Sequence, residues 1–195
     1  REVSVALLHY PVYNKNGELI VSSITNLDVH DIARVARTYR LSRYYVVTPL
    51  EAQRAILARI CRHWAKGLGA RYNATREEAF RAVTVAASLE EVLEDIRRRS
   101  GKRPTIIATG ARPLVPTWSY REMRELIRAG EGDGHFLILF GTASGIAGEI
   151  MARAHYVLDP VEGKSPYNHL SVRCAAAIIL DRLFGERDGD LSQGT

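Results

Sequence analysis

The stretch Phe136-Leu-Ile-Leu-Phe-Gly-Thr-Ala-Ser-Gly-Ile-Ala-Gly148 joins five consecutive apolar residues to a turn rich in glycine. A short, continuous apolar run bounded by glycine is typical of a strand that is buried on both faces. The residues after the glycines have the composition of a helix start. The stretch therefore predicts a unit of strand, turn and helix, from which parallel sheets are built.

The same alternation extends outward along the chain. Between the apolar runs lie segments with helical spacing, such as Ile32, Val35, Ala36 and Tyr39. Because parallel neighbours need crossover connections, we predict a single α/β domain whose mostly parallel sheet carries helices on both faces. Helix-capping patterns begin at Ser88 and Ser119, and Gly130 has the place of a terminating glycine. The five further predicted strands are Val3–His9, Tyr44–Thr48, Ala82–Ala86, Thr105–Thr109 and Tyr156–Leu158.

Composition sets the boundaries of this domain and its surroundings. Of the 195 residues, 46% are hydrophobic and 25% are charged, which is ordinary for a globular domain. We expect a domain over residues 1–184 and a flexible tail over 185–195. No apolar run approaches the roughly 20 residues of a membrane span, so no membrane partner is expected. The absence of a secretory signal and of a CxxC pattern predicts the cytoplasm, with Cys61 and Cys174 as buried structural thiols.

Charge leaves a nucleic-acid partner open. Lysine and arginine number 27 against 22 acidic residues, which gives a net charge of +5. The predicted helix over residues 50–68 could follow a phosphate backbone, or it could be an ordinary solvated amphipathic helix. Its basic residues, with those just beyond it, are Arg54, Arg59, Arg62, His63, Lys66, Arg71 and Arg76.

Ligands of open parallel sheets bind at the carboxyl ends of the strands, which directs attention to the loops over 110–119, 141–145 and 159–170. Glycines there would let a ligand approach the backbone closely, although plain turns use glycine too. The spacing G-x-x-x-G-x-x-G departs from the dinucleotide fingerprint, and Gly163-Lys164-Ser165 lacks the first glycine of a P-loop. The six histidines form no metal motif and are expected mostly at the surface or at helix caps. No metal and no serine nucleophile are predicted.

Three sequence blocks resemble the SPOUT RNA methyltransferases. They are Phe140-Gly-Thr-Ala-Ser-Gly-Ile146, Tyr156-Val-Leu-Asp-Pro160 and, above all, Tyr167-Asn-His-Leu-Ser-Val-Arg173 leading into Ala177-Ile-Ile-Leu-Asp-Arg-Leu183. The opening residues 5–13 and 25–34 are similar to a bacterial branch that is related to the tRNA guanine methyltransferase. The resemblance spans residues 3–183.

This resemblance implies a deep trefoil knot over about residues 104–183, in which S-adenosylmethionine binds. Relatives usually carry Gly-Thr-Gly-Trp-Gly where this chain has Gly141-Thr142-Ala143-Ser144-Gly145, so a flexible glycine and an aromatic wall are missing. The implied cofactor-binding residues are Thr109, Gly110, Ala111, Phe140, Gly141, Thr142, Ala143, Gly145, Leu158, Asp159, Pro160, Asn168, His169, Leu170 and Ser171.

The resemblance leaves the methylated atom open. The segment Asp31-Ile-Ala-Arg-Val-Ala-Arg37 is similar to a motif of the ribose-methylating SPOUT enzymes, which implies a catalytic Arg37 at the target hydroxyl. Arg34 and Arg37 could equally be surface partners of Asp31. Methylation of a guanine ring nitrogen would instead need an acid or an amide, for which Asn168 or Asp159 is the candidate.

Three functions follow from this reading. The first is an S-adenosylmethionine-dependent methyltransferase acting on tRNA or rRNA. The second is a non-catalytic RNA-binding module that kept the fold, which the unusual Ala143-Ser144 would favour. The third is a nucleotide-binding oxidoreductase built on the Gly141 loop. The family also implies a homodimer, to which the last helix would contribute apolar surface through Val172, Ala175, Ala176 and Ile179.

Overall fold

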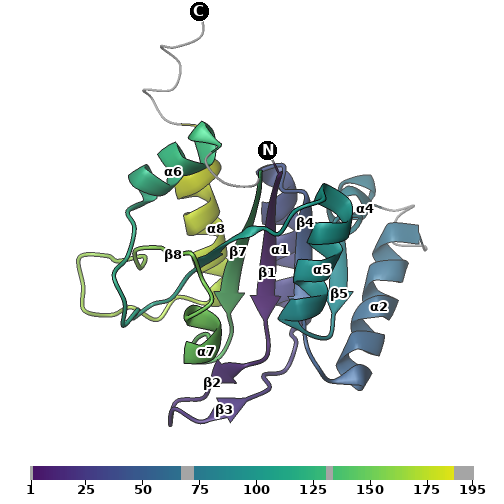
Figure 1. The fold of residues 1–195 in the computed structure, drawn as a ribbon. Helices are drawn as coiled ribbons and strands as arrows, with labels where there is room; N and C mark the ends of the chain where they lie inside the picture. Colours follow the sequence, from purple (N-terminus) through teal and green to yellow (C-terminus); the bar gives the residue numbers. More distant parts are fainter. Residues whose placement is uncertain (1, 67–72, 131–133, 187–195) are drawn as a thin grey trace, which may run out of the picture.

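The computed structural model describes residues 2–66, 73–130 and 134–186, and its centre is a six-stranded parallel sheet. The strand order is β5-β4-β1-β7-β6-β8 (Figure 1). All six predicted strands and their parallel pairing are confirmed. The strands are β1 (Glu2–Leu8), β4 (Arg43–Val47), β5 (Val83–Ala86), β6 (Thr105–Ala108), β7 (His135–Gly141) and β8 (Tyr156–Val157).

The two central strands explain the apolar runs of the sequence. β1 and β7 pair in register from Glu2 opposite His135 to Leu8 opposite Gly141. Both faces of these strands are buried, because helices cover the sheet on each side. Neither strand therefore alternates between apolar and polar residues.

The helices form a layer on each face of the sheet, as predicted. One hydrophobic core contains side chains of α1 (Asn26–Thr38), α2 (Glu51–Lys66), α4 (Ala74–Phe80), α6 (Tyr120–Ala129) and α8 (Val172–Phe184). A second core on the other face contains side chains of α5 (Leu89–Ser100) and α7 (Gly148–Met151). Figure 1 shows α5 in front of the sheet with α1 behind it.

The predicted helix signals are also confirmed. The Ser119 side chain accepts a hydrogen bond from the Glu122 N–H, and Glu122 returns the contact as a full capping box. Gly130 ends α6 with the left-handed conformation (φ 70°) that glycine adopts most easily. Ser88 caps α5 in the same way by accepting from the Glu91 N–H.

A small antiparallel hairpin was not predicted. β2 (Val12–Tyr13) pairs with β3 (Leu19–Ile20) between β1 and α1, and the Tyr10–Pro11 peptide bond before it is cis. Strands of two residues are too short to show alternation, which explains why the sequence pattern gave no signal.

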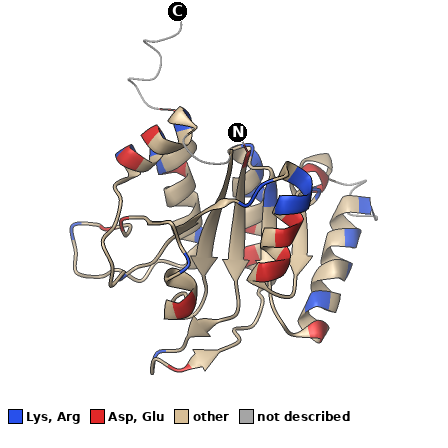
Figure 2. Cartoon of the chain, in the orientation of Figure 1, with Lys and Arg blue, Asp and Glu red and all other residues tan. Residues whose placement is uncertain are grey.

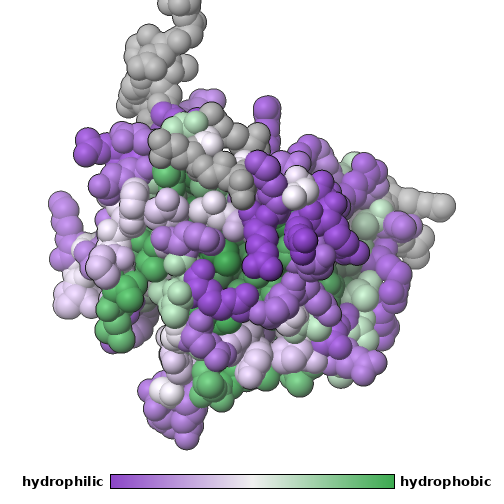
Figure 3. Space-filling model, in the orientation of Figure 1, coloured by the Kyte–Doolittle hydropathy of each residue, from purple (hydrophilic) through white to green (hydrophobic). Residues whose placement is uncertain are grey.

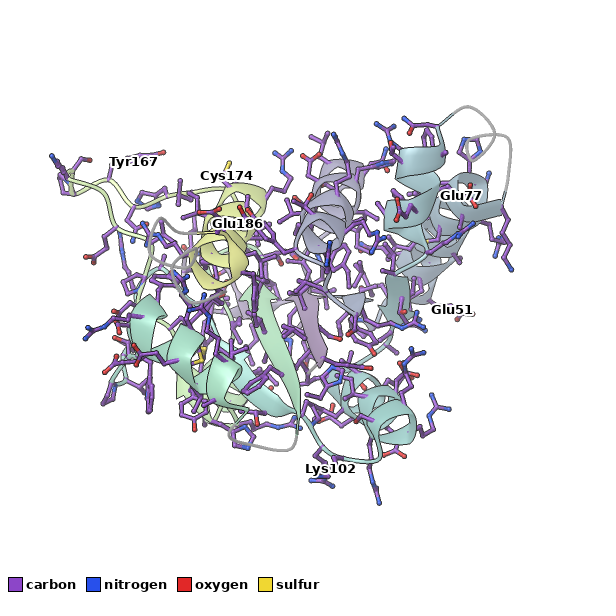
Figure 4. All side chains as sticks on the ribbon, turned by 90° about the horizontal axis from the view of Figure 1, so that it is seen from above. Glu51, Glu77, Lys102, Tyr167, Cys174 and Glu186 are labelled. Atoms are coloured by element: carbon purple, nitrogen blue, oxygen red, sulfur yellow. The ribbon has the colours of Figure 1, made fainter. Side chains whose placement is uncertain are left out.

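The two cysteines differ from each other. Cys61 is half-buried, and burial raises the pKa of its thiol to about 11. The prediction of a buried thiol is wrong for Cys174, which is exposed on α8 (Figure 4). The reason is geometric, because α8 buries the stripe formed by Ala176, Ile179, Leu180 and Leu183 and position 174 lies off it.

Two further predictions, the absence of a membrane span and the flexible tail, can be compared with the structure only within the described residues. Within those residues no helix has the length and apolarity needed to cross a membrane. Most of the predicted tail, residues 187–195, lies outside the part of the chain that the structure describes.

Candidate functional site

Three loops meet at one edge of the sheet. Because β7, β6 and β8 are parallel neighbours, their carboxyl ends point to the same side, downward in Figure 1. We call residues 109–119 after β6 the first loop, residues 140–145 at the end of β7 the second loop, and residues 158–171 after β8 the third loop. These three loops contain all the residues that the resemblance assigned to the cofactor.

The first and third loops are bound to each other. The Asn168 side-chain amide donates to the Ala111 carbonyl (3.1 Å). The Trp118 N–H donates to the Val157 carbonyl (2.8 Å), and the Asp159 N–H donates to the Trp118 carbonyl (2.9 Å). The two loops are therefore one connected unit along the outer edge of the sheet.

Asp159 joins the two loops through hydrogen bonds of its N–H, its carboxylate and its carbonyl group. Its carboxylate accepts from the Thr117 hydroxyl, and its carbonyl accepts from the Tyr120 hydroxyl (2.8 Å). An aromatic contact reinforces the junction, because the rings of Trp118 and Tyr156 meet edge to face at 4.7 Å. Asp159 thus holds the loops in place in this structure.

The second loop is held by the N-terminal part of the chain. Ser144 donates its N–H to the Tyr13 carbonyl (2.8 Å), and Tyr13 donates its N–H to the Gly145 carbonyl (2.9 Å). The Thr142 N–H and hydroxyl both donate to the Leu8 carbonyl, at 3.3 and 3.1 Å. The end of β1 and the hairpin therefore determine the shape of this loop.

Two positions of the second loop have backbone requirements. A Cβ atom on Gly141 would lie 2.6 Å from the Ile146 Cγ1 and 2.8 Å from the Ile146 backbone nitrogen, so only glycine fits there. Ala143 has φ 51°, in the left-handed region that disfavours residues with a Cβ atom. Glycine would adopt this conformation more easily than alanine does.

Backbone donors remain available at this edge. The N–H groups of Gly110, Ala111 and Ala143 make no hydrogen bond within the described residues, whereas the neighbouring N–H groups of Thr109, Thr142, Ser144 and Gly145 do. Unused N–H donors can bind a carboxylate or a ring nitrogen of a ligand. The first and second loops therefore supply a set of donors from two adjacent strand ends.

The side chains assigned to the cofactor site differ in what they can contact. Phe140 and Leu158 are buried in the core, so only their backbones could meet a ligand. The Thr109 hydroxyl donates to the Leu139 carbonyl (2.8 Å), and Ser171 caps α8. Pro160 is half-buried, whereas His169 and Leu170 are exposed on the third loop. Binding at this edge would depend mainly on backbone atoms.

Arg37 lies away from the three loops of its own chain. It is in the last turn of α1, where its guanidinium pairs with Glu78 of α4, with the Arg37 Nε 2.8 Å from the carboxylate. α1 starts after the hairpin at the loop edge and runs back toward the opposite edge, where β4 begins. The structure therefore separates the two residues to which catalysis was assigned, Arg37 and Asn168.

Two histidines are buried at opposite ends of the central strands. Surface or cap positions fit His63, His155 and His169, but this prediction is wrong for His9 and His135. The reason is that His9 continues β1 and His135 starts β7, both of which lie in the middle of the sheet. No group of three or more potential metal ligands occurs within residues 2–66, 73–130 and 134–186.

Sequence reasoning missed the residues that support the loops. Arg173 pairs with the buried Asp28 (3.3 Å) and with Asp31 (3.1 Å), which ties the start of α8 to the start of α1. The Tyr13 hydroxyl accepts a hydrogen bond from the N–H of Gly148, which starts α7 just after the second loop (3.0 Å). The only sequence signal was that Arg173 ends the block with the strongest family resemblance.

Known proteins match this chain over almost its full length. The model of a family described as SAM-dependent RNA methyltransferase matches residues 2–185. An uncharacterized protein of Aquifex aeolicus is 44% identical over 188 residues, which cover 96% of this chain and 91% of that protein. A protein of Oleidesulfovibrio alaskensis named tRNA (guanine-N(1)-)-methyltransferase is 44% identical over 186 residues, but this chain spans only 43% of its length.

The fold has a counterpart among solved structures. The crystal structure of a probable methyltransferase from Bordetella pertussis superposes with a TM-score of 0.63 and 16% identity, covering 93% of this chain and 92% of that one. The parallel sheet, the three loops at its carboxyl edge and the family match agree with one another. The chain belongs to the family of S-adenosylmethionine-dependent RNA methyltransferases.

Proposed function

We propose that this chain methylates a nucleotide of tRNA and that S-adenosylmethionine binds at the three loops described above. The supporting observation is the set of unused N–H donors at Gly110, Ala111 and Ala143, which belong to neighbouring strand ends. The choice of tRNA rests on the name of the Oleidesulfovibrio relative, of which this chain corresponds to 43%. The remainder of that relative could carry the guanine-N1 activity, so the experiments below test this chain alone.

The chemistry of the donors fits the cofactor. Backbone N–H groups can bind the carboxylate of its methionine part, and backbone carbonyls can accept from the exocyclic amine of its adenine. The small residues Gly141 and Gly145 allow close approach to the backbone. When bound, S-adenosylmethionine supplies a methyl group on a positively charged sulfur, which a lone pair of an RNA atom can take.

We favour a base nitrogen as the methylated atom. Asn168 lies at the loops, where its amide nitrogen holds Ala111 and its side-chain oxygen has no partner within the described residues. That oxygen could accept a hydrogen bond from an N–H of the target base and keep the base in position. A ribose target would require Arg37, which would have to reach these loops from a second subunit.

Cofactor binding can be tested with two glycine variants. Gly110→Ala places a methyl group beside the unused amides, and no described atom lies within 4 Å of that methyl group. Gly163→Ala also adds a methyl group in open space, at a position of the third loop to which no cofactor contact is assigned, and serves as the control. We expect calorimetry to show S-adenosylmethionine binding to the wild type and to Gly163→Ala but much weaker binding to Gly110→Ala. If NADH binds and S-adenosylmethionine does not, the proposal fails.

The product identifies the target. The protein is incubated with methyl-labelled S-adenosylmethionine and with tRNA or rRNA, and the nucleosides are separated after digestion. We expect a labelled base from tRNA and an unchanged rate for Arg37→Ala. A labelled ribose together with a roughly 10²–10³-fold slower Arg37→Ala variant would establish the ribose mechanism instead. Binding of both ligands without turnover would favour the non-catalytic module.

We further propose that RNA contacts the groove beside α2. This groove, of about 780 Å³, contains both cationic and apolar side chains. α2 carries basic residues along its length and an acidic residue only at its start (Figure 2). Arg59, Arg62 and Lys66 pair with no carboxylate within the described residues, unlike Arg37, Arg97 and Arg153. The groove is lined by Asn26, Ile56, Arg59, Ile60, Arg62, His63 and Trp64.

Salt dependence tests this surface. Replacing Arg59 and Arg62 by alanine should weaken RNA binding and reduce the slope of log K against log salt by about 1–2, because about one counterion is released per phosphate contact. The matched control removes Arg97 and Arg98 of α5, which have the same charge but pair with Glu94 and Asp95. Equal losses for the two double variants would mean that only net charge matters, and α2 would then not be the docking surface.

We also propose a homodimer, although not through the surface that the sequence suggested. Ala176 and Ile179 of α8 are buried in the core of their own chain, so that part of the prediction is wrong. The first and third loops instead expose apolar side chains, and Figure 3 shows a hydrophobic patch over the loop between β6 and α6. Contiguous exposed apolar surface often marks an interface. The residues are Leu114, Val115, Trp118, Tyr167 and Leu170, and Tyr167 extends from the tip of the third loop (Figure 4).

Light scattering decides the oligomeric state. We expect the mass of two chains at micromolar concentration, and the mass of one chain after Leu114→Glu combined with Tyr167→Ser. Ile56→Ser, which removes an exposed apolar side chain from α2, is the control and should remain dimeric. A wild-type protein of one-chain mass would exclude this interface.

The remaining expectations belong to the same proposal. Residues 1–184 would form one unit in which about 104–183 close the trefoil knot of the family. The hydrogen bonds between the first and third loops join segments within this range, among them Asn168 and Ala111, which are 57 residues apart. The unpaired Cys61 and the exposed Cys174 support a reducing compartment such as the cytoplasm.

A further inference from the structure

A buried histidine lies directly beneath the second loop. His9 follows the last residue of β1 and continues its pairing, because its N–H donates to the Val47 carbonyl (2.9 Å). Its side chain has no exposed surface. β1 is the neighbour of β7 in the sheet, so His9 lies beside the second loop at the carboxyl edge.

His9 starts a chain of side-chain hydrogen bonds that ends in the second loop. The His9 Nδ1 lies 3.0 Å from the Ser22 hydroxyl, and the Ser22 hydroxyl is bonded to the Thr142 hydroxyl. The Thr142 hydroxyl in turn donates to the Leu8 carbonyl (3.1 Å). The chain joins three segments, and Ser22 and Thr142 are 120 residues apart in sequence.

The direction of these hydrogen bonds assigns the proton on the imidazole. A carbonyl can only accept, so the single hydroxyl proton of Thr142 goes to Leu8. The Ser22 hydroxyl can then donate to Thr142 or, at 3.5 Å, to the His9 carbonyl, and with either partner its oxygen is left to accept a proton from the His9 Nδ1. Burial lowers the pKa of His9 to about 4, so the ring is neutral at neutral pH. The Nε2 is then a buried lone pair, and it has no hydrogen-bond partner.

These hydrogen bonds fix the part of the second loop that carries the unused N–H donor. Thr142 is held by Leu8 and Ser22, and Ser144 and Gly145 are held by Tyr13. Ala143 lies between these anchors, in a left-handed conformation that costs energy for alanine. Without the anchor at Thr142, the loop could relax Ala143 to an ordinary conformation and move its N–H group.

We propose that His9 is a positioning residue that acts through Ser22 and Thr142 to hold the Ala143 N–H in its place at the cofactor edge. This inference rests on the proposed cofactor site. His9 itself touches no ligand in this arrangement, because its side chain is completely buried.

The chain contains a matched control for this histidine. At the opposite edge of the sheet, the His135 Nε2 lies 3.0 Å from the Ser4 hydroxyl, and both residues are buried. This pair has the same chemistry and joins the same two central strands, but it contacts none of the three loops. Replacing it should affect folding stability without changing the second loop.

The experiment compares the two pairs by two measurements. The variants are His9→Leu, His9→Asn, Ser22→Ala, His135→Leu and Ser4→Ala. S-adenosylmethionine affinity is measured by calorimetry, and amide hydrogen exchange of residues 142–145 is measured without ligand. We expect His9→Leu and Ser22→Ala to weaken binding roughly tenfold, which corresponds to about one hydrogen bond, and to speed exchange in the second loop. His9→Asn should restore both, because its amide nitrogen can donate to Ser22 from the place of Nδ1. His135→Leu and Ser4→Ala should change neither.

Each outcome has one meaning. Wild-type affinity and exchange in His9→Leu and Ser22→Ala would overturn the inference, and so would equal losses in the His135 and Ser4 variants. If His9→Leu does not fold, Ser22→Ala and His9→Asn still provide the comparison. If the wild type binds no S-adenosylmethionine, the proposed cofactor site fails, and the exchange measurement alone decides whether His9 positions the loop.

Discussion

The second loop contains one residue in a conformation that costs energy and one position that accepts only glycine. Ala143 has φ 51°, and Gly141 is packed so closely against Ile146 that a side chain would collide with it. Beneath them, His9 and its hydroxyl partners form a buried polar chain. Strain and buried polar groups concentrate at functional sites in proteins. Their concentration at this edge agrees with the proposed cofactor site.

Ala143→Gly should stabilise the protein. The left-handed conformation costs alanine about 1–2 kcal/mol, and glycine removes this cost in the folded state. Glycine also has greater conformational freedom in the unfolded chain, which offsets about 0.4–1 kcal/mol of the stabilisation. We expect urea unfolding to show a net stabilisation of about 0.5–1 kcal/mol. Arg40→Gly is the matched comparison, because Arg40 also has a positive φ of 55°, so the same relief of strain is expected at a position away from the three loops. A destabilised Ala143→Gly variant would show that the strain at this position is not real.

Protonation of buried histidines should make the protein less stable in mild acid. Burial lowers the pKa of His9 to about 4, and it also lowers the pKa values of His30 and His135. Between pH 6.5 and 4 the unfolded chain therefore binds more protons than the folded chain, so stability is complete above pH 6.5 and is lost as the pH falls toward 4. His9 alone should account for up to about 3 kcal/mol of this loss.

The measurement is the free energy of unfolding in urea at several pH values. His9→Leu removes the titrating group and should flatten the curve between pH 6.5 and 4. If His9→Leu keeps the full wild-type slope, the ring is not buried in its neutral form.

At the scale of elements, the junction between α1 and α8 positions the third loop. Arg173, in the first turn of α8, pairs with Asp28 and Asp31 in the first turns of α1. Asp28 is buried, with its side chain 11% exposed, and Arg173 supplies the opposite charge beside it. The contact holds the start of α8, and with it the end of the third loop, against the sheet.

Removing Arg173 should therefore cost more than removing a surface ion pair. We expect Arg173→Ala to destabilise the protein by about 2–3 kcal/mol, because a buried carboxylate is left without its partner. Arg153→Ala, which breaks an exposed pair with Glu90, should cost about 0–1 kcal/mol. Adding Asp28→Asn to Arg173→Ala should recover part of the loss, since the unpaired charge is then gone. Equal costs for the two arginines would mean that Asp28 is solvated.

For the whole molecule, ligand binding provides the broadest test of function. S-adenosylmethionine at 100 times its dissociation constant should add about 2.7 kcal/mol to the stability of the folded chain. Thermal unfolding should shift upward with S-adenosylmethionine and with its demethylated product, but not with nicotinamide dinucleotides. Stabilisation by NADH alone would support an oxidoreductase built on the Gly141 loop.

The sequence by itself determined the sheet and the ends of the helices. The six apolar runs became the six strands, and Ser88, Ser119 and Gly130 act as caps. These features depend on burial of whole segments and on hydrogen bonds within a few residues, both of which leave a pattern in the local sequence. The three loops at the carboxyl edge follow from the parallel order of the strands.

Only the tertiary structure decided which side chains support the site and which lie away from it. Ser22 meets Thr142 across 120 residues, Arg173 meets Asp31 across 142, and Arg37 turns to Glu78 across 41. Such contacts depend on how crossover connections bring distant segments together. The contact partner of a single histidine or arginine therefore cannot be predicted from the local sequence around it. Local burial and capping are therefore readable from the residues, whereas the polar contacts that shape the loops exist only once the sheet has formed.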